Sequence, residues 1–230
     1  VIRRTPPLVF AMAVLSFGGF IGASTVLVRG FRMVENTITV TGASTESFES
    51  DIAKWSVQVR AAGNSQIDSF NKHKDSMKKT MDFLKANGIE DGIKHEVYLG
   101  PASISEYETK NPKTNEIIRT EWITYQSIEI LSNDVHRIQK THSKITELLG
   151  DGVLVSPSSP EFTYSKLADK RVDMLAKAAK DARIRAEAIA LQTGSVVGGV
   201  KTVNTGVFQI TVPNSTKVSS WGSYDTSTIK

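Results

Sequence analysis

The clearest pattern in this 230-residue chain is an alternation of apolar and polar residues from position 53 to position 61. Apolar side chains at Ala53, Trp55 and Val57 alternate with Lys54 and Ser56, and the alternation continues to the end of the segment. A period of two predicts a strand with one buried face and one solvated face. Similar but shorter patterns predict strands at residues 37–41, 94–99, 161–164, 196–203 and 207–212.

Three segments show helical periodicity between capping signals. Asn64 or Ser65 caps the first, which runs to about residue 86, and the second begins at Ser132-Asn133-Asp134. The third runs from about residue 165 to 192, and Gly194 ends it. On the first helix we expect His73 to face solvent. The residues that we expect to face inward are Ile67, Phe70, Met77, Met81 and Leu84 on the first helix, and Val135, Ile138, Ile145 and Leu149 on the second.

Residues 103–131 predict a long β-hairpin. Its tip lies at residues 108–116, where Asn111-Pro112 favours a turn. The order strand, cap, helix, strand occurs twice, at residues 53–99 and 122–164, although the identity between the two segments is too low to indicate a duplication. This order predicts an α+β fold of βαβ-type units, with helices packed on one face of an antiparallel or mixed sheet.

The third helix carries an apolar stripe composed mostly of alanine. Its members follow one another at steps of four and three: Ala168, Val172, Leu175, Ala179, Ala182, Ala186 and Ile189. We expect this Ala-rich helix to pack on its own sheet, or alternatively to form a subunit interface. Acidic residues interleave with its basic residues and no aromatic residue accompanies them, so we expect no nucleic-acid partner.

A separate apolar segment precedes the folded part. From Leu8 to Val28 the chain has no charged residue, which predicts a helix able to cross a hydrocarbon core of about 30 Å. We expect this segment to stay in the mature protein as a membrane anchor in contact with lipid, although a cleaved signal peptide is the alternative. Gly18 and Gly22 are four residues apart, a spacing that lets two membrane helices approach closely.

These observations divide the chain into an anchor at residues 1–33 and one α+β domain at residues 34–230. We expect a bacterial inner-membrane protein with a single span and the domain in the periplasm. The formal net charge of +4 is weak evidence for an anionic partner. The absence of cysteine excludes disulfides, thiol nucleophiles and cysteine metal sites.

No catalytic or metal-binding constellation is recognisable. Of the four histidines, His136 and His142 are six residues apart, a spacing that points them to different sides of a helix. Glu106 and Glu108 share one face of a strand, but nearby lysines favour plain solvated charge. The glycines at residues 194–199 follow a helix, which is the reverse of a dinucleotide site. We therefore expect no enzymatic activity, no catalytic residues, no cofactor and no bound metal.

The order of several short motifs resembles the SIMPL-domain family, which includes periplasmic oxidative-stress defence proteins and outer-membrane immunogens. The motifs are Ile38-Thr39-Val40-Thr41-Gly42, Asp51-Ile52-Ala53 with Trp55-Ser56-Val57, Leu84 to Ile89 with Asp91, Tyr125 to Ile130 with Asn133-Asp134-Val135, Arg171 to Leu191, and Gly194 to Val200. The resemblance covers residues 37–212. It implies an α+β fold and ring-like homo-oligomers, and it supplies no established catalytic residues. The family usually closes with a further strand after the Ser/Thr-rich segment; the sequence stops at Lys230, short of that strand, so we expect the C-terminus to be incomplete.

Two functional hypotheses follow. The first is a membrane-anchored envelope protein that assembles with itself into a ring or cage, with a structural role linked to envelope stress. The second is a periplasmic module that captures a small ligand or an envelope partner. For the first, an apolar hairpin arm that finds a partner in a neighbouring copy is the expected contact. The expected oligomer-interface residues are Gly18, Gly22, Ile104, Trp122, Ile128, Ala179, Ala182 and Ala186.

Overall fold

The computed structural model describes residues 37–215 and 219–229. Contacts divide these residues into two compact units. Residues 37–42 and Ala182–Val197 belong to the first unit, and the remaining described residues belong to the second, which holds the whole sheet. Among the described residues, no helix is both long and apolar enough to span a membrane. The segment Leu8–Val28 lies outside the described residues.

The sheet has six strands, and all of their pairings are antiparallel. The strands are β1 (Ile52–Gly63), β2 (His95–Leu99), β3 (Ser103–Lys110), β4 (Ile117–Ser132), β5 (Leu154–Pro157) and β6 (Glu161–Thr163). The central order is β2-β4-β1-β5. β3 extends the β4 side, and β6 pairs with the start of β1. The predicted α+β class is therefore confirmed, and the sheet is purely antiparallel.

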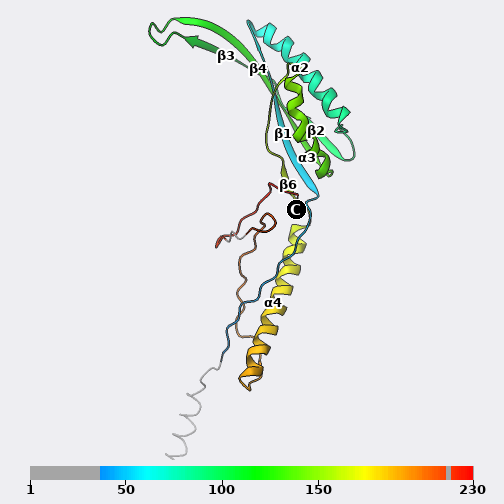
Figure 1. The fold of residues 1–230 in the computed structure, drawn as a ribbon, viewed down its shortest axis with the longest axis vertical. Coiled ribbons are helices and arrows are strands. Elements are labelled where there is room, and N and C mark those ends of the chain that lie inside the picture. The colour runs from blue at the N-terminus through cyan, green and yellow to red at the C-terminus, as the bar shows by residue number, and fades with distance from the viewer. Residues whose placement is uncertain (1–36, 216–218, 230) are drawn as a thin grey trace, which may run out of the picture. The chain divides into compact units, whose positions relative to one another are not determined.

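The connections explain how two strand–helix–strand units give a sheet without parallel neighbours. β1 and β2 run in the same direction with β4 between them, and β4 and β5 likewise enclose β1. Each predicted βαβ-type unit is thus split by a strand of the other, as in ferredoxin-like folds. This arrangement places the connecting helices on one face of the sheet (Figure 1).

Three α-helices and one 3₁₀ helix are present in the described part of the chain: α2 (Gln66–Ala86), α3 (Val135–Lys144), η1 (Ile145–Leu149) and α4 (Leu167–Gln192). Both predicted caps are confirmed. The Ser65 hydroxyl accepts from the Asp68 amide at 3.1 Å, and the Asp134 carboxylate accepts from the Arg137 amide at 3.0 Å. Such caps satisfy amides that have no partner inside the helix.

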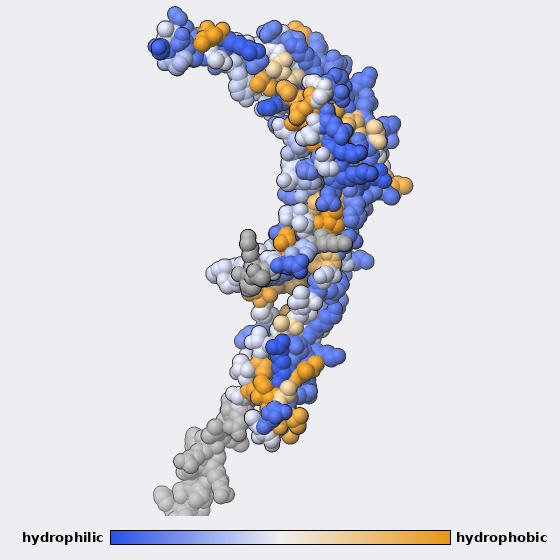
Figure 2. Space-filling model, viewed as in Figure 1, coloured by the Kyte–Doolittle hydropathy of each residue, from blue (hydrophilic) through white to orange (hydrophobic). Residues whose placement is uncertain are grey.

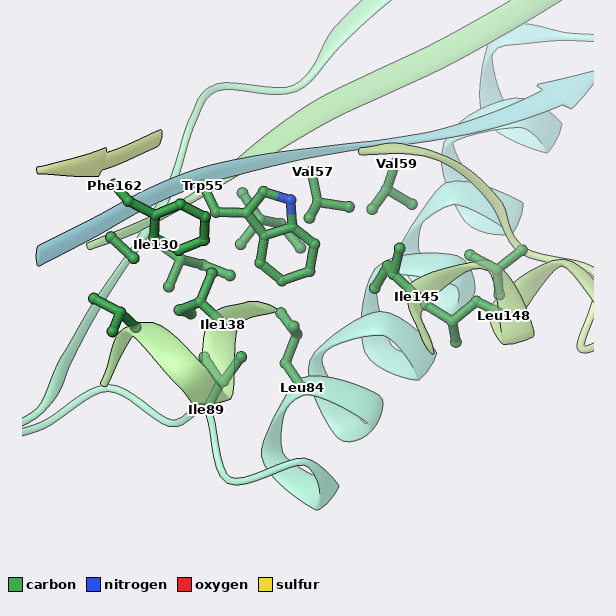
Figure 3. Close-up of a cluster of buried hydrophobic side chains, with 14 of the residues drawn as sticks. Trp55, Val57, Val59, Leu84, Ile89, Ile130, Ile138, Ile145, Leu148 and Phe162 are labelled. Carbon is green, nitrogen blue, oxygen red and sulfur yellow. The ribbon is translucent and has the colours of Figure 1, made fainter. Parts of the chain in front are cut away.

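The hydrophobic core lies between the sheet and α2, α3 and η1 (Figure 3). Trp55 is its largest side chain and is 1 % exposed, and its indole nitrogen donates to the Ser158 carbonyl at 3.1 Å. Ile138 and Ile145 cover the same face of the sheet, as predicted. Leu148 is buried in place of Leu149, because η1 has three residues per turn and shifts the inward position.

The prediction for α2 is confirmed in part: Met77 and Leu84 are buried and Met81 packs against the core, but the rest of the buried side is polar. Its buried residues are Ser69, His73, Ser76, Met77, Thr80 and Leu84. Ile67 and Phe70 are instead 75 % and 46 % exposed. The Ser69 hydroxyl lies 2.7 Å from the Thr124 hydroxyl, across the contact between α2 and β4. Small hydroxyl side chains let the helix approach the sheet closely, and this displaces the larger apolar residues outward.

Three predicted strands do not form. Residues 37–41, 196–203 and most of 207–212 have no regular structure, and Ile210 makes only an isolated bridge with Tyr224. A strand needs a neighbouring strand to satisfy its backbone hydrogen bonds. The central strand β1 already has partners on both of its edges, so it has no free edge for these segments. Val196 and Val200 are 95 % and 75 % exposed, so their β-branched side chains have no core to enter.

The expectation that α4 packs on the sheet is wrong. Val172 and Leu175 of its predicted inward stripe are 66 % and 40 % exposed. The sheet face is already covered by α2, α3 and η1. The start of α4 is held instead by residues 43–46, which lie outside the sheet.

Candidate assembly surfaces

The hairpin formed by β3 and β4 continues beyond the sheet as a two-stranded arm (residues 106–121; Figure 1). Pairing between β1 and β4 ends at Gly63 opposite Trp122, so β4 before Trp122 has only β3 as a neighbour. The arm carries half-exposed apolar side chains at Tyr107 (54 %), Ile117 (53 %) and Ile118 (65 %), and Ile104 (41 %) lies at its root, opposite Thr124. Two strands alone cannot bury such side chains, which makes the arm a candidate contact surface.

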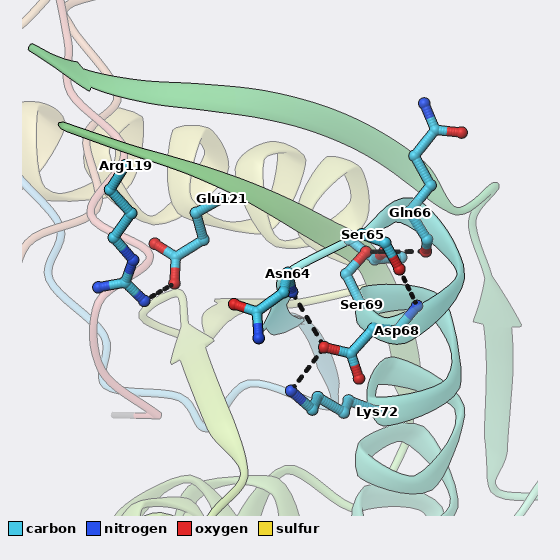
Figure 4. Close-up of polar contacts among 9 residues, drawn as sticks. Asn64, Ser65, Gln66, Asp68, Ser69, Lys72, Arg119 and Glu121 are labelled. Carbon is cyan, nitrogen blue, oxygen red and sulfur yellow. Dashed lines mark hydrogen bonds and ion pairs between the residues drawn. The ribbon is translucent and has the colours of Figure 1, made fainter. Parts of the chain in front are cut away.

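A group of polar contacts fixes the root of the arm (Figure 4). The Asp68 carboxylate accepts from the Asn64 amide and from Lys72, both at 2.9 Å. These bonds lower the pKa of Asp68, with the Lys72 hydrogen bond as the largest cause. On the arm itself, Arg119 donates to Glu121 at 2.8 Å. The turn from β1 into α2 is therefore rigidly capped where the arm leaves the sheet.

The first half of α4 is held by residues 43–46 of the same chain. Glu46 accepts from Lys170 and from Lys177, the second at 2.6 Å. These hydrogen bonds lower the pKa of Glu46 to about 2. The Ala43 amide donates to Asp181 at 2.9 Å, and the Ser44 hydroxyl lies 3.5 Å from the Met174 sulfur. The residues held in this way define one polar face of the helix.

The other side of this helix segment is open and apolar. We call it the α4 seam: Ala168, Val172, Leu175 and Ala179, all of which are exposed. Hydrophobic residues at the surface of both α4 and the arm are visible in Figure 2. The seam is a second candidate contact surface.

A shallow cavity of about 380 Å³ lies at the end of α2, beside α3. Its charged lining comprises Asp134, Arg137, Lys140 and Lys144, with His136 at its edge. Arg137 donates to Asp134 at 3.1 Å and to the Asn87 carbonyl at 3.2 Å, so the one acid is already neutralised. The excess of positive charge suits an anionic group, but no nucleophile and base are paired there. Within residues 37–215 and 219–229, no cluster of ligating side chains could hold a metal.

A family model described as SIMPL, a protein of unknown function (DUF541), matches residues 38–225. The chain belongs to the SIMPL family. The match covers most of the chain and includes the sheet, α4 and the segment after it. No curated protein sequence matches this SIMPL chain.

Two solved structures are similar to parts of the SIMPL chain. One is a "putative aminohydrolase" from methicillin-resistant Staphylococcus aureus, with 10 % identity and a TM-score of 0.29 over 55 % of this chain and 33 % of that one. The other is a "putative amidohydrolase/peptidase" from Burkholderia cenocepacia, with 9 % identity and a TM-score of 0.30 over 62 % and 36 %. The chain spans about a third of each. This likeness is too low to support an argument about activity.

The structure separates the predicted interface residues of this SIMPL protein into groups. Ile104 and Trp122 both lie at the root of the arm, and Ala179 lies on the exposed α4 seam. Ile128 is fully buried in the core, because it pairs with Val57 on the helix-covered face, and is therefore not an exposed arm residue. Of the remaining residues, Ala182 is half-buried and Ala186 is buried, while Gly18 and Gly22 lie outside the described residues.

Sequence reasoning missed two buried histidines. His73 is 2 % exposed and His95 is 6 % exposed, and neither His73 Nε2 nor His95 Nδ1 has a hydrogen-bond partner among the described residues. Burial lowers the pKa of both imidazoles. Periodicity could have placed His73 on the inner face, since it is four residues from Ser69 and eleven from Leu84.

Because both histidines are buried with lowered pKa values, we expect the stability of the protein to depend on pH. Because the folded-state pKa values lie below 6.5, the unfolded chain takes up protons first, and stability falls as the pH drops below about 6.5. The loss approaches about 1.4 kcal/mol per pH unit for each histidine. Urea unfolding at pH 8 and pH 5.5 measures it. His73→Gln should reduce the loss of unfolding free energy between the two pH values, and His136→Gln, at an exposed position, should not. An equal loss in the unsubstituted protein and both variants would contradict the prediction.

Proposed function

We propose that this SIMPL-family protein is a membrane-anchored component of the bacterial envelope that assembles with copies of itself into a ring- or cage-like homo-oligomer. Its role is structural, it is linked to envelope stress, and it is not enzymatic. The segment Leu8–Val28 holds it in the inner membrane, and the folded domain lies in the periplasm. The anchor proposal rests on the charge-free sequence of that segment.

The observation that carries the assembly proposal is the arm. A monomer with this arm leaves Tyr107, Ile117 and Ile118 in water, together with strand edges that have no neighbour among the described residues. Unpaired edges and exposed apolar side chains both favour association, and natural proteins normally cover them. A neighbouring copy supplies an identical arm, so exchange of hairpins between neighbours satisfies both needs.

The test is the size of the full-length protein in mild detergent, compared with a variant lacking residues 106–119. We expect a large discrete particle for the full chain. After the deletion, Ser105 and Ile123 remain paired across a short loop, so the domain should fold while the particle dissociates. Substitution of the polar tip by Lys113→Ala with Glu116→Ala is the matched control and should leave the particle intact.

Two results would contradict this proposal. A monomeric full-length protein would exclude self-assembly. A particle of unchanged size after the deletion, with the same circular dichroism spectrum, would show that assembly does not use the arm.

The cavity beside α3 favours one second candidate, a module that captures a small anionic ligand. Arg137, Lys140 and Lys144 supply the positive charge for it. This candidate predicts a small assembly and saturable binding of inorganic phosphate by calorimetry, which a Lys140→Ala, Lys144→Ala variant should weaken. A large particle with no phosphate binding would favour the first function.

A further inference from the structure

The outer edge of β2 is covered by the turn that precedes it. β2 ends the central strand order, so in the described part of the chain one of its edges has no strand beside it. The Gly92 amide donates to the His95 carbonyl at 2.8 Å, and the Val97 amide donates to the Asp91 carboxylate at 3.1 Å. Both residues of β2 point these backbone groups away from β4, because alternate residues of a strand face alternate neighbours. We call residues 88–94 the β2 clasp, since they bond the groups with which another strand would pair.

His95 follows the clasp directly and is buried. It is 6 % exposed, and its Nδ1 atom has no hydrogen-bond partner among the described residues. The register places it opposite Ser132 and on the face of the sheet that the helices cover. A proton on this nitrogen would add a positive charge with no acceptor, and burying an uncompensated charge costs free energy.

The charges around the ring do not compensate such a proton. Burial is the largest cause of the lowered pKa of His95, and the cations Arg137 of α3 and Lys94 of the clasp lower it further. Asp134 and the Gly88 backbone act in the opposite direction. The Asp134 carboxylate is already occupied, however, because it accepts from the Arg137 amide at 3.0 Å and from Arg137 Nε at 3.1 Å.

Arg137 is fixed beside the turn where the clasp begins. It donates to the Asn87 carbonyl at 3.2 Å, and a Cβ atom added at Gly88 would lie 2.4 Å from its Nη1 atom. The guanidinium therefore packs directly on the chain at this turn. A swing of Arg137 away from the ring would break its bonds to both Asn87 and Asp134, so the structure does not relieve a charge on His95 in this way.

The clasp is the element that can move. Residues 90–94 are all exposed, and Ile89, which is 1 % exposed, anchors them to the core. The two acids of the clasp are engaged elsewhere, Asp91 with an amide of β2 and Glu90 with Lys85 at 2.7 Å. Segments with few buried apolar contacts and exposed backbone hydrogen bonds open at a low free energy, without unfolding of the whole domain.

We propose that protonation of His95 opens the β2 clasp and exposes the outer edge of β2, while the rest of the sheet stays folded. The inference goes beyond the proposed function and does not depend on self-assembly. In the open clasp water reaches the imidazole, which takes up a proton near its ordinary pKa of about 6.5. The equilibrium constant for opening therefore rises as the pH falls below about 6.5, by up to about tenfold per pH unit. Opening leaves the His95 carbonyl and the Val97 amide free to pair with a strand of another chain.

Amide hydrogen exchange of the full-length protein in mild detergent measures this opening. The Gly92 and Val97 amides make the two bonds of the clasp, so they report on it directly. Exchange rates at pH 7.5 and pH 5.5 are divided by those of an unstructured peptide of residues 88–99, which removes the intrinsic effect of pH. We expect the protection of both amides to fall at pH 5.5 by up to about tenfold. The protection of the Ile128 and Ile130 amides should fall less, because β4 is paired on both sides there.

Two variants assign the effect to one ring. His95→Gln removes the titrating group and should abolish the pH dependence of the Gly92 and Val97 amides. His73→Gln is the matched control, because it removes another buried histidine, in α2, and should leave that dependence unchanged. The NMR chemical shift of the His95 ring in the unsubstituted protein is a measurement that needs no variant to fold. The ring should take up its proton over the same pH range in which the two amides lose protection.

Four results would each overturn the inference. Unchanged protection of the Gly92 and Val97 amides would show that the clasp does not open. An equal loss at Ile128 and Ile130 would mean that the whole domain unfolds. A loss retained in His95→Gln would assign the effect to another group, and a protonated His95 ring beneath fully protected amides would separate protonation from opening.

Discussion

Replacement of Trp55 by alanine should lower the free energy of unfolding by about 3–5 kcal/mol. The indole is 1 % exposed, packs edge-on against His142 with ring centroids 5.7 Å apart, and donates to the Ser158 carbonyl. The substitution creates a cavity and also leaves that carbonyl without its donor. Since domains are stable by only about 5–15 kcal/mol, this loss is a large fraction of the stability.

Urea unfolding followed by circular dichroism measures this loss. Trp221→Ala is the matched control, because Trp221 is 95 % exposed, and it should change the stability by less than about 0.5 kcal/mol. A loss of under 1 kcal/mol for Trp55→Ala would mean that the packing around the indole is not as described.

Gly63→Ala should destabilise the protein by about 1–3 kcal/mol or more, through overpacking. A Cβ atom at Gly63 would lie 2.3 Å from the Ser69 amide nitrogen and 2.7 Å from its Cα. Both are backbone atoms of α2, so relief requires the whole helix to move away from the sheet. That movement would also stretch the bond between Ser69 and Thr124.

The same unfolding experiment applies, with Gly92→Ala as the control, because no atom lies within 4 Å of its added Cβ. Equal stabilities for the two variants would show that α2 does not approach β1 as closely as the structure indicates. A selective loss for Gly63→Ala would explain why the chain has glycine at the end of β1.

The elements that the sequence predicted best are those whose local signals agree with their surroundings. β1 alternates because one of its faces is covered and the other is not, and Ser65 and Asp134 cap helices by purely local hydrogen bonds. Family membership was also predictable, because it depends on the order of short motifs along the chain.

The predictions that were wrong concern residues whose burial depends on tertiary contacts. Counting apolar residues placed Phe70 inside and His73 outside, but the close approach at Gly63 selects the small and polar side of α2. The seam of α4 was recognised by its period, but a period does not say which surface covers it. The contacts of Glu46 with Lys170 and Lys177 join segments far apart in sequence, and no local pattern indicates them.

The split topology also has a consequence for how the chain folds during synthesis. β1 is the central strand and the first to leave the ribosome, but every one of its neighbours is made later. Ala53 pairs with Ser132 in β4 and with Phe162 in β6, the last strand of the sheet. Such distant pairings slow folding, because long loops must close, at a cost in chain entropy, before the strands can form their contacts. The apolar face of β1 therefore stays unpaired during translation until β4, β5 and β6 have been synthesised.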